Sequence, residues 1–266
     1  MNITKTKKGK TVEMSFESVS EILSYISDTP ESNHSRNHNK PSFCPFTWEE
    51  SIGLFREGWP DGVKDIAFQA DRINDQIDEA SGYGIEQDVT GDYIDVGSYL
   101  EGVPECFGKM VTAEGPKDEV EIIVSAAVSV RVNTSTVFHR GAAIASLIDQ
   151  LRRTHFVKLS FVVKVTGITG SDITTYFHVN MQNEYSRDLI AFMAANAAYL
   201  RRIWFSIAEK VLGRDECEGY GSVSDITPPP GVIYFEGLTK NEGWETIDEA
   251  IQRVQAILDG ITQGNA

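Results

Sequence analysis

Hydrophobic residues in the second half of the chain follow two spacings. At positions 157–165 every second residue is apolar, which is typical of a strand with one buried face. The same alternation returns at 177–181 after a turn at 167–170, so the two strands are expected to form an antiparallel hairpin. Residues 119–132 are nearly continuous in β-branched and apolar residues, which predicts a buried strand.

Helical spacing separates these strands. A helix is predicted from about 133 to 153, the longest one from Arg187 to Leu212, and a last one after a short strand at 232–235. Strands that alternate with helices predict parallel crossovers and a sheet with helices on both faces. We therefore expect an α/β fold with a mostly parallel sheet and one antiparallel hairpin at its edge.

The first half predicts helices and irregular chain. A short amphipathic helix is expected within 19–26, and a polar loop from 27 to 45. The pair Thr47 and Glu50 predicts a capping box at the start of a further helix. Residues 81–117 are rich in glycine and acids. The predicted division is a helical and irregular region over 1–117 and an α/β domain over 118–266.

Composition narrows the function classes. The chain of 266 residues has a formal net charge of −15, which argues against binding duplex DNA through a basic face. No apolar run is long enough for a membrane helix or follows the N-terminal lysines as a signal peptide would. Three widely spaced cysteines predict free thiols in a reducing compartment. We expect a cytoplasmic protein.

Few residues indicate chemistry. The sequence lacks a nucleophile-elbow pattern, a Walker loop and a dinucleotide fingerprint. His34 and His38 lie four residues apart, but a surface loop explains them better than a metal site. Arg140 is interpreted as a solvent-exposed helix residue. Arg187, Arg201 and Arg202 could contact an anionic ligand, but Arg201 and Arg202 fit the solvent-exposed side of their helix. An acidic cluster is the main candidate for a divalent metal, with a solvated loop as the simpler reading: Asp92, Asp95, Glu101 and Glu105. Asp149 and Asp172 could also supply oxygen ligands near strand ends.

Two stretches carry a resemblance to known families. Glu121-Ile-Ile-Val-Ser-Ala-Ala-Val-Ser129, Arg140-Gly-Ala-Ala-Ile-Ala-Ser-Leu-Ile-Asp149 and the strand at 158–166 resemble the first strand, helix and second strand of the von Willebrand factor A-like fold. Metal-binding members carry Asp-x-Ser-x-Ser after the first strand. This chain has Ser125-Ala-Ala-Val-Ser129 there, so we expect no metal site of that type. Phe46-Thr-Trp-Glu-Glu and Gly58-Trp-Pro-Asp-Gly62 resemble a family of uncharacterised proteins of tailed phages and prophages.

The favoured hypothesis is a non-enzymatic interaction protein of phage or prophage type, without a cofactor. Its partner would be a host protein or a second copy of itself, so a homo-oligomer is one expected form. Candidate interface anchors are Trp48, Trp59 and Trp244, with core packing as the default alternative. Two alternatives stay open: a metal-dependent enzyme using the acidic cluster, and a nucleic-acid-associated protein using the basic arm Lys5–Lys10.

Overall fold

The structure is a computed structural model. It describes residues 2–5, 11–38, 44–81, 85–88, 93–94, 99–100, 102–104, 106–110, 118–129, 131–181, 185–213, 215–217, 223–224, 226–240 and 243–262. The helices are α1 (Val19–Ile26), α2 (His34–Asn37), α3 (Trp48–Glu57), α4 (Pro60–Ser81), α6 (Thr134–Thr154), α7 (Arg187–Ala195), the π-helix η1 (Tyr199–Trp204), α8 (Phe205–Leu212), the short 3-10 helix η2 (Asp215–Cys217) and α9 (Ile247–Thr262). The strands are β1 (Asn2–Lys5), β2 (Thr11–Phe16), β3 (Ile85–Asp88), β4 (Tyr93–Ile94), β5 (Phe107–Met110), β6 (Glu119–Ser125), β7 (Phe156–Thr166), β8 (Asp172–Val179), β9 (Val223–Ser224) and β10 (Ile233–Phe235).

One seven-stranded sheet organises most of the chain, in the order β1-β2-β8-β7-β6-β10, with β9 paired to β7. Strands β6, β7 and β10 run parallel, and β8 pairs antiparallel with β7 as the predicted hairpin. The prediction of an α/β fold with parallel strands, flanking helices and an antiparallel hairpin is confirmed. The hairpin is not at the sheet edge, however, because β2 pairs in parallel with β8 and β1 continues beyond it.

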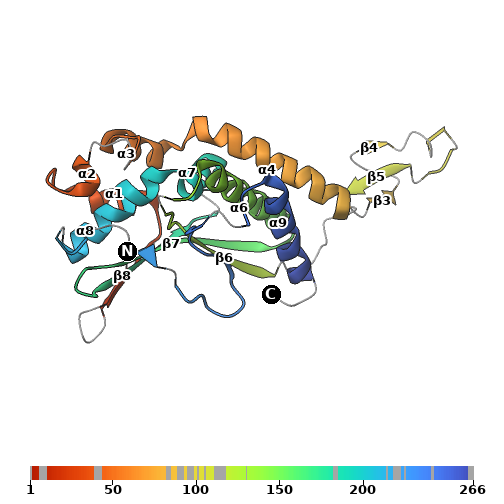
Figure 1. The fold of residues 1–266 in the computed structure, drawn as a ribbon. Helices are drawn as coiled ribbons and strands as arrows, with labels where there is room; N and C mark the ends of the chain where they lie inside the picture. The colour runs from red at the N-terminus through yellow and green to blue at the C-terminus, as the bar shows by residue number, and fades with distance from the viewer. Residues whose placement is uncertain are drawn as a thin grey trace.

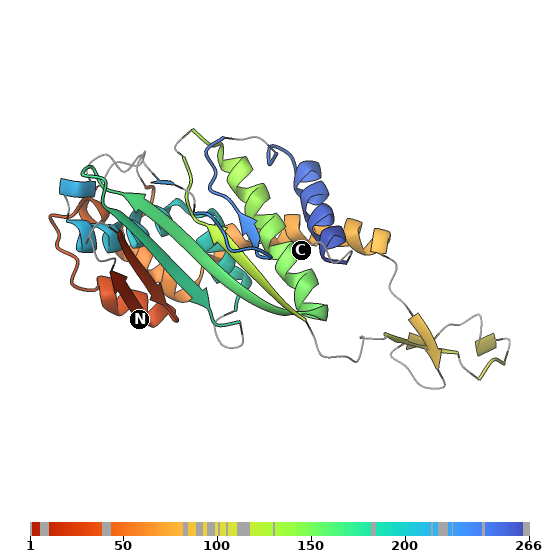
Figure 2. The ribbon, with the colours of Figure 1, turned by 90° about the horizontal axis from the view of Figure 1, so that it is seen from below.

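The helices α4, α6, α7 and α9 lie over one face of the sheet, as Figures 1 and 2 show. The sequence predicted helices on both faces of the sheet, but these four all lie on the same side. Alternation along the strands explains part of the arrangement, although Ser160 and Val162 on the opposite side of β7 are also buried. In β7, Leu159 and Phe161 are buried beneath the helices, whereas Lys158 is exposed on the other side. In β8, Phe177 is buried while Tyr176 and its stacked neighbour His178 are half-buried on the opposite face.

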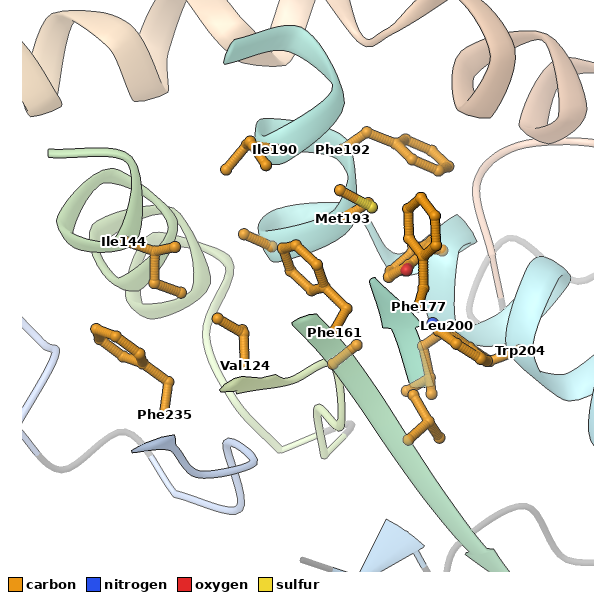
Figure 3. Packing of buried hydrophobic residues seen from close by; sticks show 14 of the residues in the cluster. Val124, Ile144, Phe161, Phe177, Ile190, Phe192, Met193, Leu200, Trp204 and Phe235 are labelled. Carbon is orange, nitrogen blue, oxygen red and sulfur yellow. The ribbon is translucent and has the colours of Figure 1, made fainter. Parts of the chain in front are cut away.

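The core fills the space between the sheet and these helices (Figure 3). Side chains from the strands, including Val124, Phe161 and Phe235, face Ile144 of α6 and Ile190 of α7. Phe235 belongs to the last strand and packs against Trp244 with ring centroids 6.1 Å apart. The core therefore joins strands and helices from the beginning to the end of the predicted α/β domain at 118–266 into one apolar layer.

The predicted long helix at 187–212 is interrupted. Helix α7 ends at Ala195, Asn196 leaves helical geometry, and the chain re-enters as η1 before continuing as α8. A π-helix is rare and is often found at functional sites. Asn196 explains the local break, because its Oδ1 accepts from the backbone N–H of Ala198 at 2.9 Å and so caps the new start.

The N-terminal part contributes two strands that hydrophobic spacing did not predict. Val12, Met14 and Phe16 of β2 alternate inward, but the run is short and follows the lysine-rich start. Strands β3, β4 and β5 form a separate three-stranded sheet, which lies beyond the end of α4 (Figures 1 and 2). The predicted division at 117/118 stays a prediction, although β2 and α4 pack into the same sheet and core as the second region.

Candidate functional site

The carboxyl end of β6 is the centre of the candidate site. The chain passes from β6 through α6 to β7 on one side, while β10 pairs on the other side of β6. Such a reversal of strand order leaves a crevice at the carboxyl ends of the strands, which is where open α/β sheets bind ligands. The loops that leave β6 and β10 run side by side here. The backbone N–H of Leu238 donates to the carbonyl oxygen of Ala127, and the N–H of Ser129 donates to that of Leu238.

Arg140 ties the two strand ends together at this point. Its Nη2 donates to the carbonyl oxygens of Ser125 at 2.9 Å and Glu236 at 2.8 Å, and lies 3.2 Å from that of Phe235. The side chain is 1% exposed. The interpretation of Arg140 as a solvent-exposed helix residue is therefore wrong. A fixed guanidinium at this place also repels a metal cation at the end of β6.

A cavity of about 400 Å³ opens beside this crossing, and we call it the sheet-edge pocket. The loop after β6, the first turn of α6, the end of α7, the start of η1 and the segment before α3 form its walls. Its lining is Pro45, Phe46, Trp59, Ala126, Val128, Ser129, Val132, Thr134, Val137, Phe138, Met193, Ala194, Ala195, Asn196, Ala197, Leu200 and Arg201. A volume of this size and mostly apolar walls are typical of pockets for organic ligands.

Trp59 forms one wall and is positioned by two glycines. Its ring stacks on Phe138 with centroids 5.7 Å apart and an interplanar angle of 25°. A Cβ atom on Gly62 would lie 2.2 Å from the indole, so only glycine lets the ring lie against α4. Gly58 has φ of +94°, and a Cβ there would lie 2.4 Å from Cβ of Asp188. The Gly-Trp-Pro-Asp-Gly stretch therefore fixes this aromatic wall.

Besides the indole N–H of Trp59, the polar side chains of the described lining are those of Asn196, Arg201, Ser129 and Thr134. Asn196 is 6% exposed, and its Nδ2 has no hydrogen-bond partner among the described residues. Arg201 adds a cation, and burial lowers the pKa of its guanidinium, which remains protonated at neutral pH. Ser129 and Thr134 add hydroxyl groups. No aspartate, glutamate, histidine or cysteine is present among the described residues of the lining.

Two features of the described lining bring positive charge to the sheet-edge pocket, although the chain is acidic overall. Thr134 lies in the first turn of α6, where the helix dipole presents partial positive charge and no acidic residue neutralises it. Arg201 adds the full positive charge of its guanidinium to the lining. The pocket therefore favours an acceptor or an anion.

The neighbouring Arg202 holds the segment that brings Phe46 to the pocket. It is 1% exposed and donates to the carbonyl oxygens of Ser35 at 2.8 Å, Phe46 at 2.9 Å and His38 at 3.0 Å. Glu209 in α8 accepts from the backbone N–H of Ser35 at 3.1 Å and from its hydroxyl. The interpretation of Arg202 as a surface residue is therefore wrong.

The other predicted site residues lie as follows. Trp48 and Trp244 are 8% and 6% exposed and belong to the core, whereas half-buried Trp59 lines the pocket. The acidic cluster Asp92, Asp95, Glu101 and Glu105 lies outside the described residues, as does most of the basic arm. His34 and His38 begin and follow α2 with their rings stacked 4.4 Å apart. Within the described ranges, no group of three or more metal-ligating side chains was found.

Sequence reasoning missed Asn196, the residue that most distinguishes the site. The apolar spacing around it reads as continuous helix, and the only signal was an asparagine with low helix propensity inside an alanine-rich run. Arg201 was considered from the sequence as a contact for an anionic ligand, but the spacing favoured the solvent side for it and for Arg202.

The fold and site define an α/β protein with a preformed, cationic and largely apolar pocket at the carboxyl edge of its sheet. The chain belongs to the family described as a domain of unknown function, DUF7192, whose model matches residues 2–262. Neither a curated protein nor a solved structure matches the chain. Among the described helices, none combines the length and the apolar character that crossing a membrane requires.

Proposed function

We propose that this chain is a non-enzymatic interaction module that binds a protein partner by inserting an apolar anchor of the partner into the sheet-edge pocket. The observation that carries the proposal is the lining itself. It offers apolar walls and hydrogen-bond donors, but its described residues include no carboxylate, imidazole or thiol that could act as a base or nucleophile. Such a lining suits recognition better than catalysis.

The arrangement of strands supports a von Willebrand A-like scaffold as part of the proposal. The order β8-β7-β6-β10, with only β8 antiparallel among the four, agrees with the resemblance at the first strand and helix. In place of a metal, Arg140 supplies positive charge at the carboxyl end of β6. Recognition would then depend on the shape and donors of the pocket rather than on a shared cation.

A capture experiment with a pocket-filling variant tests the function. Ala197 lines the pocket and is exposed, so Ala197→Trp fills or covers the opening with little effect on the core. Ala256 is exposed on α9 and outside the lining, so Ala256→Trp is the matched control. The tagged wild type and both variants are incubated with bacterial lysate, the type of source that the phage resemblance indicates, and the captured proteins are identified.

The proposal expects a stoichiometric protein on the wild type and on Ala256→Trp that is lost on Ala197→Trp. Capture that survives in Ala197→Trp would place the interaction elsewhere on the molecule. A second copy of the chain as the captured species would make the partner the chain itself, and the same loss in Ala197→Trp is then expected in a mass measurement of the oligomer. Capture by none of the three proteins would refute the proposal.

A further inference from the structure

The most deeply buried polar group of the sheet-edge pocket is a hydrogen-bond donor, the side-chain amide of Asn196. Asn196 uses its Oδ1 to accept from Ala198, which fixes the orientation of the amide and leaves Nδ2 as the group without a partner among the described residues. A buried amide donor without an acceptor is costly to a folded chain. A ligand that brings an acceptor to Nδ2 removes that cost.

The charge of the pocket selects among acceptors. Arg201 and the first turn of α6 favour a negative group over a neutral carbonyl, and the described lining has no acidic side chain to compete. The remaining walls are apolar, from Val128 and Phe138 to Met193 and Leu200. A small, singly charged anion next to an apolar body fits both features. A phosphate, with two charges and more acceptor oxygens, would need more donors than these walls supply.

We propose that the sheet-edge pocket binds a carboxylate carried by an apolar group, with Asn196 Nδ2 and the Arg201 guanidinium donating to the carboxylate oxygens. This inference rests on the proposed function and deepens it. The C-terminal residue of a partner polypeptide carries this chemistry, with its side chain against Trp59 and Phe138. A free aromatic or aliphatic acid carries the same chemistry, and the experiment separates the two sources.

The test compares three probes by isothermal titration calorimetry on the full chain, up to about millimolar concentration. The first is an acetylated pentapeptide that ends in phenylalanine with a free carboxylate. The second is the same peptide with a C-terminal amide, which keeps the apolar side chain and removes the charge. The third is 3-phenylpropionate, which has the aromatic ring and the carboxylate without a peptide chain.

Two variants remove the proposed donors separately. Asn196→Asp keeps an oxygen that accepts from the N–H of Ala198 but replaces Nδ2 with a negatively charged oxygen. Arg201→Gln removes the cation and keeps a side chain of similar reach. Arg153→Gln is the matched control, because it removes an equal charge at a site outside the lining. Arg153 is exposed at the C-terminal end of α6, whereas Thr134 at the N-terminal end of that helix lines the pocket.

We expect the free peptide acid to bind the wild type and Arg153→Gln about tenfold or more tightly than the amide. This preference should disappear in Asn196→Asp and in Arg201→Gln. Equal affinity for acid and amide in the wild type would overturn the carboxylate inference and leave the apolar-anchor function intact. An acid preference that persists in both variants would overturn the assignment of Asn196 and Arg201.

The third probe separates the sources of the carboxylate. Binding of 3-phenylpropionate as tight as that of the peptide acid, with the same loss in the two variants, supports the carboxylate inference but contradicts a protein anchor. Binding of the peptide acid alone supports both proposals. If none of the three probes binds, the carboxylate inference fails, while the capture experiment with Ala197→Trp still decides the proposed function independently.

Discussion

Replacing Arg202 with methionine is expected to destabilise the protein by about 3 kcal/mol. The side chain is fully enclosed, and its three shortest hydrogen bonds, to carbonyl oxygens of Ser35, His38 and Phe46, are 2.8 to 3.0 Å long. Methionine keeps most of the apolar stem but none of the donors. Water replaces part of each lost interaction, so we count roughly 1 kcal/mol for each of these three bonds rather than the larger value for isolated charged pairs.

Urea unfolding measures this loss. With a denaturant dependence of about 3 kcal/mol per M for a chain of this size, the midpoint should fall by about 1 M. Arg201→Met is the control, since it removes the adjacent guanidinium from the pocket wall and leaves the three hydrogen bonds from Arg202 to Ser35, His38 and Phe46 in place. The urea midpoint of Arg201→Met should stay within a few tenths of 1 M of the wild-type midpoint.

Hydrogen exchange gives a second readout of the same change. The backbone N–H groups of Ser35, Arg36 and His38 should exchange faster in Arg202→Met, because the segment loses its attachment to η1. A midpoint unchanged in Arg202→Met, or one that falls as far in Arg201→Met, would refute the reasoning that Arg202 is a clamp and Arg201 a ligand-facing residue.

Three further predictions concern other buried groups. Burial raises the pKa of Glu209 above its ordinary value of 4.5, so its folded form holds a proton more tightly and its stabilising contribution is lost as pH rises through the folded pKa. The free energy of unfolding of the wild type should therefore fall relative to that of Glu209→Gln as the pH rises from 4.5 through the raised pKa of the folded state, and a constant difference would contradict this. Burial and the hydrogen bond to Asp149 raise the pKa of Tyr185 to about 12. In a pH titration followed by tyrosinate absorbance, the transition that is missing in Tyr185→Phe should therefore lie near pH 12. In Asp149→Asn the pKa of Tyr185 should be lower than in the wild type. Arg140→Met should cost about 3 kcal/mol in thermal or urea unfolding, because carbonyl groups of two strands lose their shared donor, whereas a loss below about 1 kcal/mol would show that water replaces it.

The class of fold followed from local spacing, and the reason is visible in β7 and α6. Every second residue of β7 contacts the core, and α6 buries a continuous face. Each element can therefore be predicted from its own stretch of sequence. Strand β2, the partner of β8, could not be predicted in this way. Strand β2 is six residues long, lies next to a basic segment and pairs with a strand far along the chain.

The candidate site was harder to predict, because its residues acquire meaning only in three dimensions. Arginine in a helix is ordinarily exposed, yet Arg140 and Arg202 are buried, because carbonyl groups of distant segments supply acceptors for them. Asn196 interrupts a helix that spacing predicts to be continuous. In each case a specific tertiary contact overrides the local preference of the residue.

The parallel pairing of β2 with β8 has a consequence for how the protein is made. During synthesis the N-terminal strand leaves the ribosome long before β8 exists, since Phe16 pairs with Phe177, more than half the chain away. Closing so long a loop carries an entropic cost that local contacts do not, which slows folding. Until then the apolar side of β2 has no sheet to join, so the growing chain depends on a late, non-local pairing and is open to misassembly or chaperone binding while it waits.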